Sequence, residues 1–145
     1  MHVLEREAAY PRSLAEVFGF FADAGNLEVI TPPWLRFKIL TPLPIAMRVG
    51  AIIDYQLTLR GIPIRWRTEI TAWEPPHRFV DEQRRGPYRL WRHEHTFREE
   101  GNSVRVRDRV QYAHLGGPVV QALMVAPELR RIFDYRMEVI SAHLG

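Results

Sequence analysis

The sequence predicts an α+β fold in which a curved, seven-stranded antiparallel sheet, two short helices and one long C-terminal helix enclose a cavity. Three observations support this prediction. Apolar residues recur at every second position along most of the chain, short turns separate these segments, and one long segment with three- and four-residue spacing follows them. A length of 145 residues is typical of one domain, so we expect a single domain over residues 1–145.

The N-terminal segment predicts a strand followed by a helix. Residues His2 to Tyr10 alternate loosely between apolar and polar side chains, and Pro11 ends this pattern. Ser13 and Glu16 then form a capping box, in which Ser13 can accept a hydrogen bond from the Glu16 N–H and Glu16 can reach back to Ser13. We therefore expect the first helix to start at this point.

A second short helix and another strand are expected next. Asn26 is a suitable cap for a helix from Leu27 to Ile30, which Pro32 would end. From Trp34 to Ile39 the period changes to two, which is typical of a strand. The sheet is therefore expected to resume at Trp34.

The central part of the chain predicts a meander of six strands. Turns rich in Gly, Pro and Asn separate them, and connections this short force neighbouring strands to be antiparallel. A twisted sheet of this size is expected to curl. The six predicted strands cover Trp34 to Ile39, Ile53 to Leu59, Ile64 to Ile70, Phe79 to Gln83, Tyr88 to Arg98 and Val104 to Tyr112.

The segment from Pro118 to His143 carries the only long helical pattern. Pro127 interrupts it and predicts either a kink or a short first helix, with Pro127 at the first position of the main one. A long helix laid into the concave face of the sheet would cover its apolar side. Space left between helix and sheet would form a binding cavity.

A polar band is predicted on the inward face of three neighbouring strands. Period-two alternation places five polar side chains there, on the same face as Trp91, Phe97 and other apolar residues. Burying ionisable groups costs several kcal/mol unless they are paired, so the band requires an explanation. Its members are Asp81, Gln83, His93, His95 and Asp108.

Three explanations of this band are open. It can be a mutually satisfied network, in which Asp81 or Asp108 holds a histidine N–H and Gln83 completes the bonds. It can perform acid–base catalysis, with His93 or His95 moving a proton in an aldol-type cyclisation or dehydration. It can bind a metal through the two histidines and one aspartate. We expect neither a metal nor a cofactor, and name His93, His95, Asp81 and Asp108 as catalytic residues only for an enzyme.

The cavity wall is expected to combine aromatic and polar side chains. Arg136 shares a helix stripe with Phe133 and Val139, so it either extends to the cavity mouth or pairs with an inner carboxylate such as Asp108. The predicted ligand-binding residues are Tyr55, Trp66, Phe79, Gln83, Trp91, His93, His95, Tyr112, Met124, Phe133 and Arg136.

Composition argues against several classes of protein. The lack of cysteine excludes disulfides and thiolate zinc sites, so we expect a reducing compartment, the cytoplasm. The first residues carry charges where a signal peptide needs an apolar run, and no run of about 18 apolar residues suggests membrane insertion. The net charge of +3 comes from dispersed arginines, so no nucleic-acid partner is expected.

Several local strings, together with the order of the elements, resemble the START/SRPBCC superfamily and in particular a bacterial subgroup of small stand-alone proteins. The resemblance covers nearly the whole chain. The strings include Phe18 to Asp23, Ile30 to Pro33, Trp66, Phe79 to Gln83, Gly86 to Tyr88, Trp91 to Phe97, Asp108 and Ile132 to Arg136.

This resemblance implies the helix-grip fold, with a deep hydrophobic cavity that the superfamily uses for lipids, polyketides, quinones and hormones. We therefore expect a protein, monomeric or homodimeric, that binds or carries a hydrophobic or aromatic small molecule. The alternative is an enzyme of the polyketide cyclase, aromatase or dehydratase type that uses the polar band for acid–base chemistry. Because one fold serves many functions, the resemblance alone does not choose between them.

Overall fold

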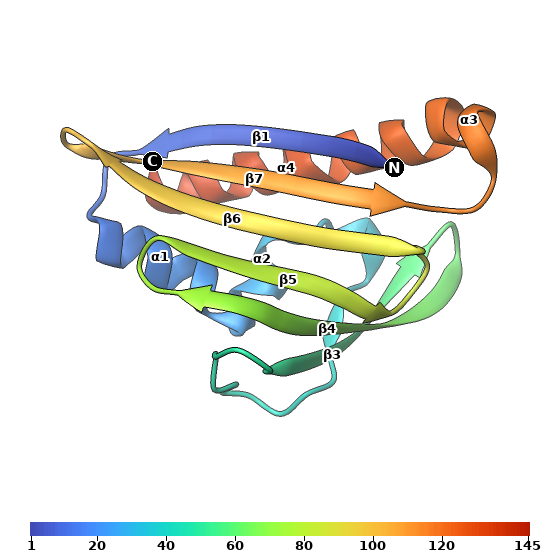
Figure 1. The fold of residues 1–145 in the computed structure, drawn as a ribbon, viewed down its shortest axis with the longest axis horizontal. Helices are drawn as coiled ribbons and strands as arrows, with labels where there is room; N and C mark the ends of the chain where they lie inside the picture. Colours follow the sequence, from blue (N-terminus) through green and yellow to red (C-terminus); the bar gives the residue numbers. More distant parts are fainter.

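The computed structural model describes residues 1–145 and contains one seven-stranded, antiparallel sheet (Figure 1). Its strand order is β1-β7-β6-β5-β4-β3-β2, so β2 to β7 form the predicted meander and β1 joins its far edge. This confirms the predicted fold class. The strands are β1 His2–Tyr10, β2 Lys38–Ile39, β3 Ile52–Leu59, β4 Ile62–Glu74, β5 Arg78–Arg85, β6 Leu90–Glu100 and β7 Ser103–Ala113.

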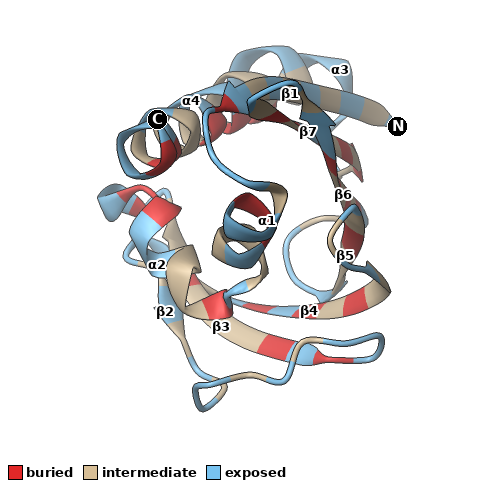
Figure 2. Ribbon diagram, turned by 90° about the vertical axis from the view of Figure 1, so that its left-hand side faces the viewer, coloured by how far each residue is buried: buried red, intermediate tan, exposed pale blue.

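Helices close the open side of the curved sheet. Figure 2 shows the sheet bending around an interior, with α4 and α2 opposite its concave face, and Figure 1 shows α1 near one end of the molecule. The longest helix, α4, buries one stripe against the sheet and packs against α2 and β1. The helices are α1 Leu14–Ala22, α2 Leu27–Ile30, α3 Gly117–Val120 and α4 Ala126–Leu144, with 3₁₀ turns at Ala24–Asn26 and Pro33–Leu35 and a π turn at Gln121–Val125.

The start of α1 confirms the predicted cap, but the start of α2 does not. Ser13 Oγ accepts a hydrogen bond from the Glu16 N–H at 3.1 Å and donates one to Glu16 Oε1 at 3.0 Å. The Glu16 side chain thus reaches back to Ser13 through the Ser13 hydroxyl. Asn26 has helical backbone angles, and its side chain makes no capping hydrogen bond to α2. Its Nδ2 instead donates to the Phe20 carbonyl at 2.8 Å, which satisfies one of the free carbonyls at the end of α1.

The strand predicted from Trp34 to Ile39 is wrong over all but its last two residues. Residues Pro33–Leu35 form a 3₁₀ turn, and Arg36 follows with a left-handed φ of 48°. Two successive prolines and this positive φ prevent extended pairing, so β2 contains only Lys38–Ile39. Such a short strand leaves little unpaired edge on this side of the sheet.

The C-terminal helical segment follows the second predicted alternative. A short helix, α3, leads through the π turn into α4, and Pro127 lies in the first turn of α4. Proline costs no helical hydrogen bond at this position, because N–H groups of the first turn have no partner inside the helix.

The interior contains two apolar clusters. The cluster at the α1 end includes Phe18, Phe97 and Ile140, and the other includes Trp66, Trp91, Tyr112, Leu129 and Phe133. Along β6, the histidines at positions 93 and 95 separate Trp91 of one cluster from Phe97 of the other. Polar groups therefore occupy the middle of the concave face, between the two apolar clusters.

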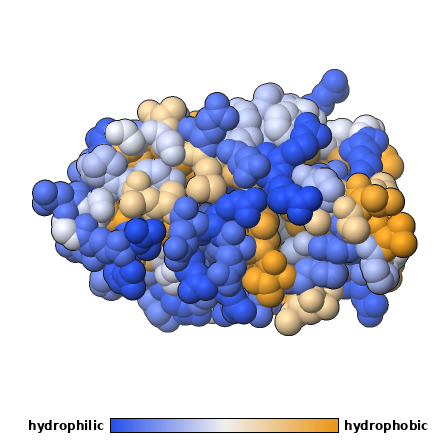
Figure 3. Space-filling model, turned by 90° about the horizontal axis from the view of Figure 1, so that it is seen from above, coloured by the Kyte–Doolittle hydropathy of each residue, from blue (hydrophilic) through white to orange (hydrophobic).

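Apolar side chains remain exposed around α3. Leu115, Val119 and Leu123 are 68 to 74% exposed, and Figure 3 shows hydrophobic surface at this end of the molecule. Among the helices, none has both the length and the apolar character required to cross a membrane.

Candidate functional site

A cavity of about 170 Å³ lies between the sheet, α4 and the segment around α1 and α2. Most of its wall is hydrophobic. The sheet, α1 and α4 all contribute aromatic rings. The predicted residues that line it are Tyr55, Trp66, Phe79, Asp81, Trp91, His93, His95, Phe133 and Arg136.

Four predicted residues do not line the cavity. Met124 is 41% exposed, because it lies in the π turn, whose extra residue rotates the following side chains relative to an ideal helix. Gln83 instead closes the β5–β6 turn by hydrogen bonds to both backbone groups of Tyr88. Tyr112 is buried beside the cavity and accepts from the Gln121 side chain at 2.6 Å, and Asp108 lies behind the histidines.

The cavity also uses residues that the sequence analysis did not name. Thr68 lies between Trp66 and Ile70 on β4, where period two would have placed it on the inner face, and its hydroxyl lies 3.3 Å from the Tyr55 hydroxyl. Phe21 comes from α1, and no strand periodicity could have assigned it to this wall. The contribution of α1 depends on how the helix docks, which is a tertiary property.

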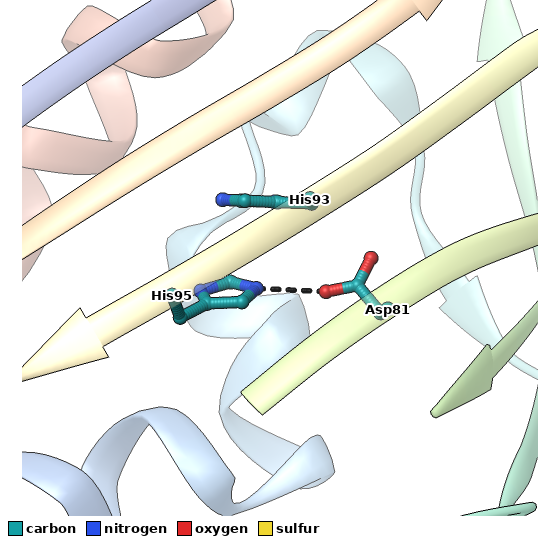
Figure 4. A group of neighbouring side chains, drawn as sticks. All are labelled: Asp81, His93 and His95. Carbon is teal, nitrogen blue, oxygen red and sulfur yellow. Dashed lines mark hydrogen bonds and ion pairs between the residues drawn. The ribbon is translucent and has the colours of Figure 1, made fainter. Parts of the chain in front are cut away.

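Four side chains form an inner polar cluster, which we define as Asp81, His93, His95 and Asp108. In the register of the sheet, Asp81 is opposite His93 and His95 is opposite Asp108. The hydrogen bonds nevertheless run diagonally, from His95 Nε2 to Asp81 at 2.7 Å (Figure 4) and from His93 Nε2 to Asp108 at 2.8 Å. Each histidine thus has its own carboxylate, as the network explanation requires.

The imidazole rings of this cluster are stacked. The centroid of His95 lies 3.7 Å from that of His93 and 4.1 Å from that of Phe79, with nearly parallel planes. Phe133 of α4 tilts against His93 at 5.7 Å. Apolar rings therefore cover both ends of the stack, which holds the histidines in fixed positions and excludes water from them.

The pKa of His95 is raised above its ordinary value. Burial alone would lower its pKa, but the carboxylates of Asp108 and Asp81 outweigh burial and raise the pKa. Its Nε2 donates to Asp81, and its Nδ1 lies 3.3 Å from Asp108 Oδ1. The two carboxylates in turn have lowered pKa values, because these imidazole contacts outweigh their own burial. Contact with two carboxylates thus favours the imidazolium form of His95.

His93 is held in the neutral form. Burial lowers its pKa, and the adjacent charge of His95 lowers it further, which outweighs the bond to Asp108. An ionised carboxylate can only accept, so Nε2 of His93 carries the proton and Nδ1 carries the lone pair. Nδ1 makes no hydrogen bond with the protein, and His93 lines the cavity. The site therefore presents an imidazole base, oriented by a buried carboxylate.

Three side chains of this cluster are close enough together to be considered as metal ligands. Donor atoms of Asp81, His93 and His95 lie within 4.8 Å of one another, which is close enough for a common ion. A metal held by the Asp81 carboxylate and His95 Nε2 would have to replace their 2.7 Å hydrogen bond. Since the Asp81 carboxylate and His95 Nε2 are already engaged with each other, these residues fit a hydrogen-bonded network better than an open coordination site.

Arg136 does not form the predicted ion pair with an inner carboxylate, and its extension to the cavity mouth stays a prediction. It lines the cavity, partly buried, and forms no ion pair with Asp108 or any other carboxylate. Its Nε is buried without a hydrogen-bond partner, and so is Nε1 of Trp66. Nδ1 of His95 is likewise buried without a hydrogen bond, although it lies 3.3 Å from Asp108 Oδ1. The wall therefore contains three buried nitrogens without a hydrogen bond, in addition to Nδ1 of His93.

Residues 10–134 match a protein family described as "Polyketide cyclase / dehydrase and lipid transport". The chain belongs to this family. This confirms the resemblance to the START/SRPBCC superfamily. No match was found among functionally curated proteins.

Solved structures share the fold of this family member over almost the whole chain. Protein CV1439 from Chromobacterium violaceum has a TM-score of 0.77 at 11% identity, with 98% of this chain and 96% of that chain covered. Mll3558 from Rhizobium loti has a TM-score of 0.75 at 17% identity, with 99% of this chain and 96% of that chain covered. Ginseng major latex-like protein 151 from Panax ginseng has a TM-score of 0.72 at 13% identity, with 99% of this chain and 97% of that chain covered. At these identities the likeness shows the fold alone.

Proposed function

We propose that this protein binds, and carries, a small hydrophobic or aromatic molecule that enters the cavity with a polar group directed at the inner polar cluster. The observation that carries the proposal is the cavity itself, with mostly apolar walls and with Asp81, His93 and His95 on its sheet side. The lipid-transport part of the family description and the family's cyclase members are both compatible with such a cavity.

The polar groups of the wall restrict the ligand. A wholly apolar ligand would leave Nε of Arg136 and Nε1 of Trp66 buried without partners, which costs about 1–3 kcal/mol for each group. A ligand with carbonyl, hydroxyl or carboxylate oxygens would satisfy them. A volume of about 170 Å³ offers room for one or two rings of a lipid, quinone or polyketide-like molecule, and a larger ligand would extend through the mouth.

Native mass spectrometry of freshly purified protein tests this proposal. Ala24 lines the cavity and is buried, so Ala24→Leu should narrow it, whereas Ala9→Leu adds the same side chain to an exposed position of β1. We expect a co-purified organic molecule on the wild type and on Ala9→Leu but not on Ala24→Leu. Titration with the neutral probe 2-naphthamide, followed by calorimetry, should show the same pattern, with binding to Ala24→Leu at least tenfold weaker. If Ala24→Leu binds the ligand and the probe as tightly as wild type does, the ligand lies outside this cavity and the proposal is contradicted.

One observation favours a second function, acid–base catalysis. His93 offers an unprotonated Nδ1 on the cavity wall, and Asp108 orients the ring through Nε2. Such a base could remove a proton from a carbon acid of the ligand, as the first step of an aldol-type cyclisation or dehydration. Incubation of the extracted ligand with protein in D₂O should then introduce deuterium at that carbon. His93→Gln should abolish the exchange and leave binding intact, whereas absence of exchange in the wild type would leave only the carrier function.

A further inference from the structure

The charged side chains that line the cavity are unevenly partnered. Two cationic groups and three carboxylates contribute to the wall, together with the neutral His93. The charged and titratable lining residues are Asp23, Asp81, His93, His95, Glu128 and Arg136.

All three carboxylates of the wall already have a partner. Asp81 accepts from His95 at 2.7 Å, Asp23 accepts a backbone N–H at 2.9 Å, and Glu128 pairs with Arg60 at 3.3 Å. None of them forms an ion pair with Arg136. Since His95 is also engaged by carboxylates, Arg136 is the cation of the wall that has no acidic partner.

Two aromatic rings flank the guanidinium of Arg136, and its Nε is withdrawn from water. The guanidinium carbon lies 5.8 Å from the ring centroid of Phe133 and 5.9 Å from that of Phe21. Both rings also line the cavity, and the Nε of Arg136 is buried without a hydrogen-bond partner. Aromatic rings can stabilise a cation, but they cannot accept the directed hydrogen bonds of a guanidinium.

We propose that Arg136 anchors an acidic oxygen group of the ligand, such as a carboxylate, an enolate or a phenolate. This inference rests on the proposed ligand-binding function and adds the chemical class of the ligand. A guanidinium offers parallel N–H donors that match the oxygens of a carboxylate, and such charge-assisted bonds strengthen when water is excluded. The two phenyl rings leave the apolar part of the ligand in contact with Phe21 and Phe133 while its acidic end meets Arg136.

A pair of probes with the same shape tests the inference. We suggest 2-naphthoate, which is anionic, and 2-naphthamide, which is neutral, each titrated into the full chain by calorimetry at pH 7. Wild type should bind 2-naphthoate more tightly than 2-naphthamide. In Arg136→Gln, the affinity for 2-naphthoate should fall at least tenfold, and the affinity for 2-naphthamide should stay within about twofold, as expected for the loss of a charge-assisted hydrogen bond.

Two further variants separate charge at this site from charge in general. Arg131→Gln removes the same charge from the same helix, but Arg131 is exposed, over the ring of Trp34, so both affinities should stay unchanged. Arg136→Met keeps the apolar stem and should reproduce the loss for 2-naphthoate. Thermal unfolding of each variant checks that it is folded, and Arg136→Met replaces Arg136→Gln if the latter is not.

The possible results differ for the two proposals. If wild type binds both probes equally, or if the Arg136 variants weaken both probes equally, Arg136 is only part of the wall and the inference is wrong, while the proposed function stands. If Arg131→Gln reduces 2-naphthoate binding as strongly, the preference comes from the surface and the inference is again wrong. If neither probe binds, the proposed function fails, and the inference fails with it.

Discussion

Strands β6 and β7 carry charged side chains on both faces, and the two faces use them in opposite ways. The inner face holds the inner polar cluster, in which each histidine bonds to a carboxylate and aromatic rings exclude water. The outer face, with β1 and β5, holds an outer charge ladder of arginines and glutamates. We define this ladder as Glu5, Glu7, Arg78, Glu94, Arg105, Arg107 and Arg109.

The difference shows how burial changes the stability that is lost when one partner of an ion pair is removed. In the ladder, Glu5 and Glu7 each meet two arginines. Most ladder side chains are about one-third to one-half exposed, so water and salt screen them. In the inner polar cluster, His93 and His95 have relative side-chain exposures of 6 and 4%. A partner lost there cannot be replaced by water. The loss of one charge from the inner polar cluster should therefore lower the free energy of unfolding more than the loss of one charge from the outer charge ladder.

The largest expected effect comes from Asp108→Asn. This change keeps the shape of the side chain but removes the charge that faces both His93 and His95. Removing one partner from a buried pair costs about 3–5 kcal/mol of unfolding free energy. Urea unfolding at pH 7 measures the loss.

The matched control for Asp108→Asn is Glu94→Gln, on the opposite face of β6. Glu94 is paired with Arg78 at 2.7 Å, but partial exposure should limit its loss to about 1 kcal/mol or less. Equal losses for the two variants would contradict the distinction between the faces.

The second prediction concerns pH. Because the pKa of His95 is raised, its contribution to stability is complete below its ordinary value of 6.5 and is lost as the pH rises through the higher native pKa. Because the pKa of His93 is lowered, the unfolded chain takes up its proton first, so stability also falls as the pH drops below 6.5. Unfolding free energy should therefore peak near neutral pH, with slopes of at most about 1.4 kcal/mol per pH unit for each histidine.

Single variants assign the two slopes. His93→Gln should flatten the decline just below pH 6.5, and His95→Gln should flatten the decline above it. The lowered pKa values of Asp81 and Asp108 add a further loss only as the pH falls below 3.8. His77→Gln, in the exposed turn between β4 and β5, serves as control and should keep the wild-type profile. A profile that both inner variants leave unchanged would show that the cluster is not charged as described.

The sequence was sufficient to predict which face these residues occupy, but not how they are paired. Alternation along β6 places His93 and His95 inside because Trp91 and Phe97 share their period. The partner of each histidine depends on strand register and on side-chain rotamers, and the diagonal bonds could not be read from spacing.

Two other positions show where local patterns fail. Gln83 shares the period of Asp81, but the adjacent turn offers both backbone groups of Tyr88, and these bonds remove it from the cluster. Met124 has helical spacing, yet the π turn changes the phase of the helix and leaves it exposed. Backbone irregularities of this kind depend on tertiary packing, so the fold was predictable to a greater extent than the site.

The third prediction lies in the most protected part of the outer charge ladder. Arg78 donates to Glu94 at 2.7 Å and to Glu74 at 3.0 Å, and its side chain is 27% exposed. Arg78→Gln should reduce the unfolding free energy by about 1 kcal/mol or less, measured with urea, and 0.5 M NaCl should diminish the difference. A loss as large as that of Asp108→Asn would remove the contrast between the two faces.

The smallest effect is expected where the ladder is most exposed. Glu5 accepts from Arg107 at 2.8 Å and from Arg109 at 3.2 Å, and its side chain is 43% exposed. After Glu5→Gln, both arginines keep their hydration and Arg107 keeps a second carboxylate, Glu7, at 4.0 Å. The unfolding free energy should therefore change less than for Arg78→Gln, and the remaining difference should disappear in 0.5 M NaCl because the charges are screened. A difference that persists in salt would mean that the outer face, like the inner one, holds its charges away from water.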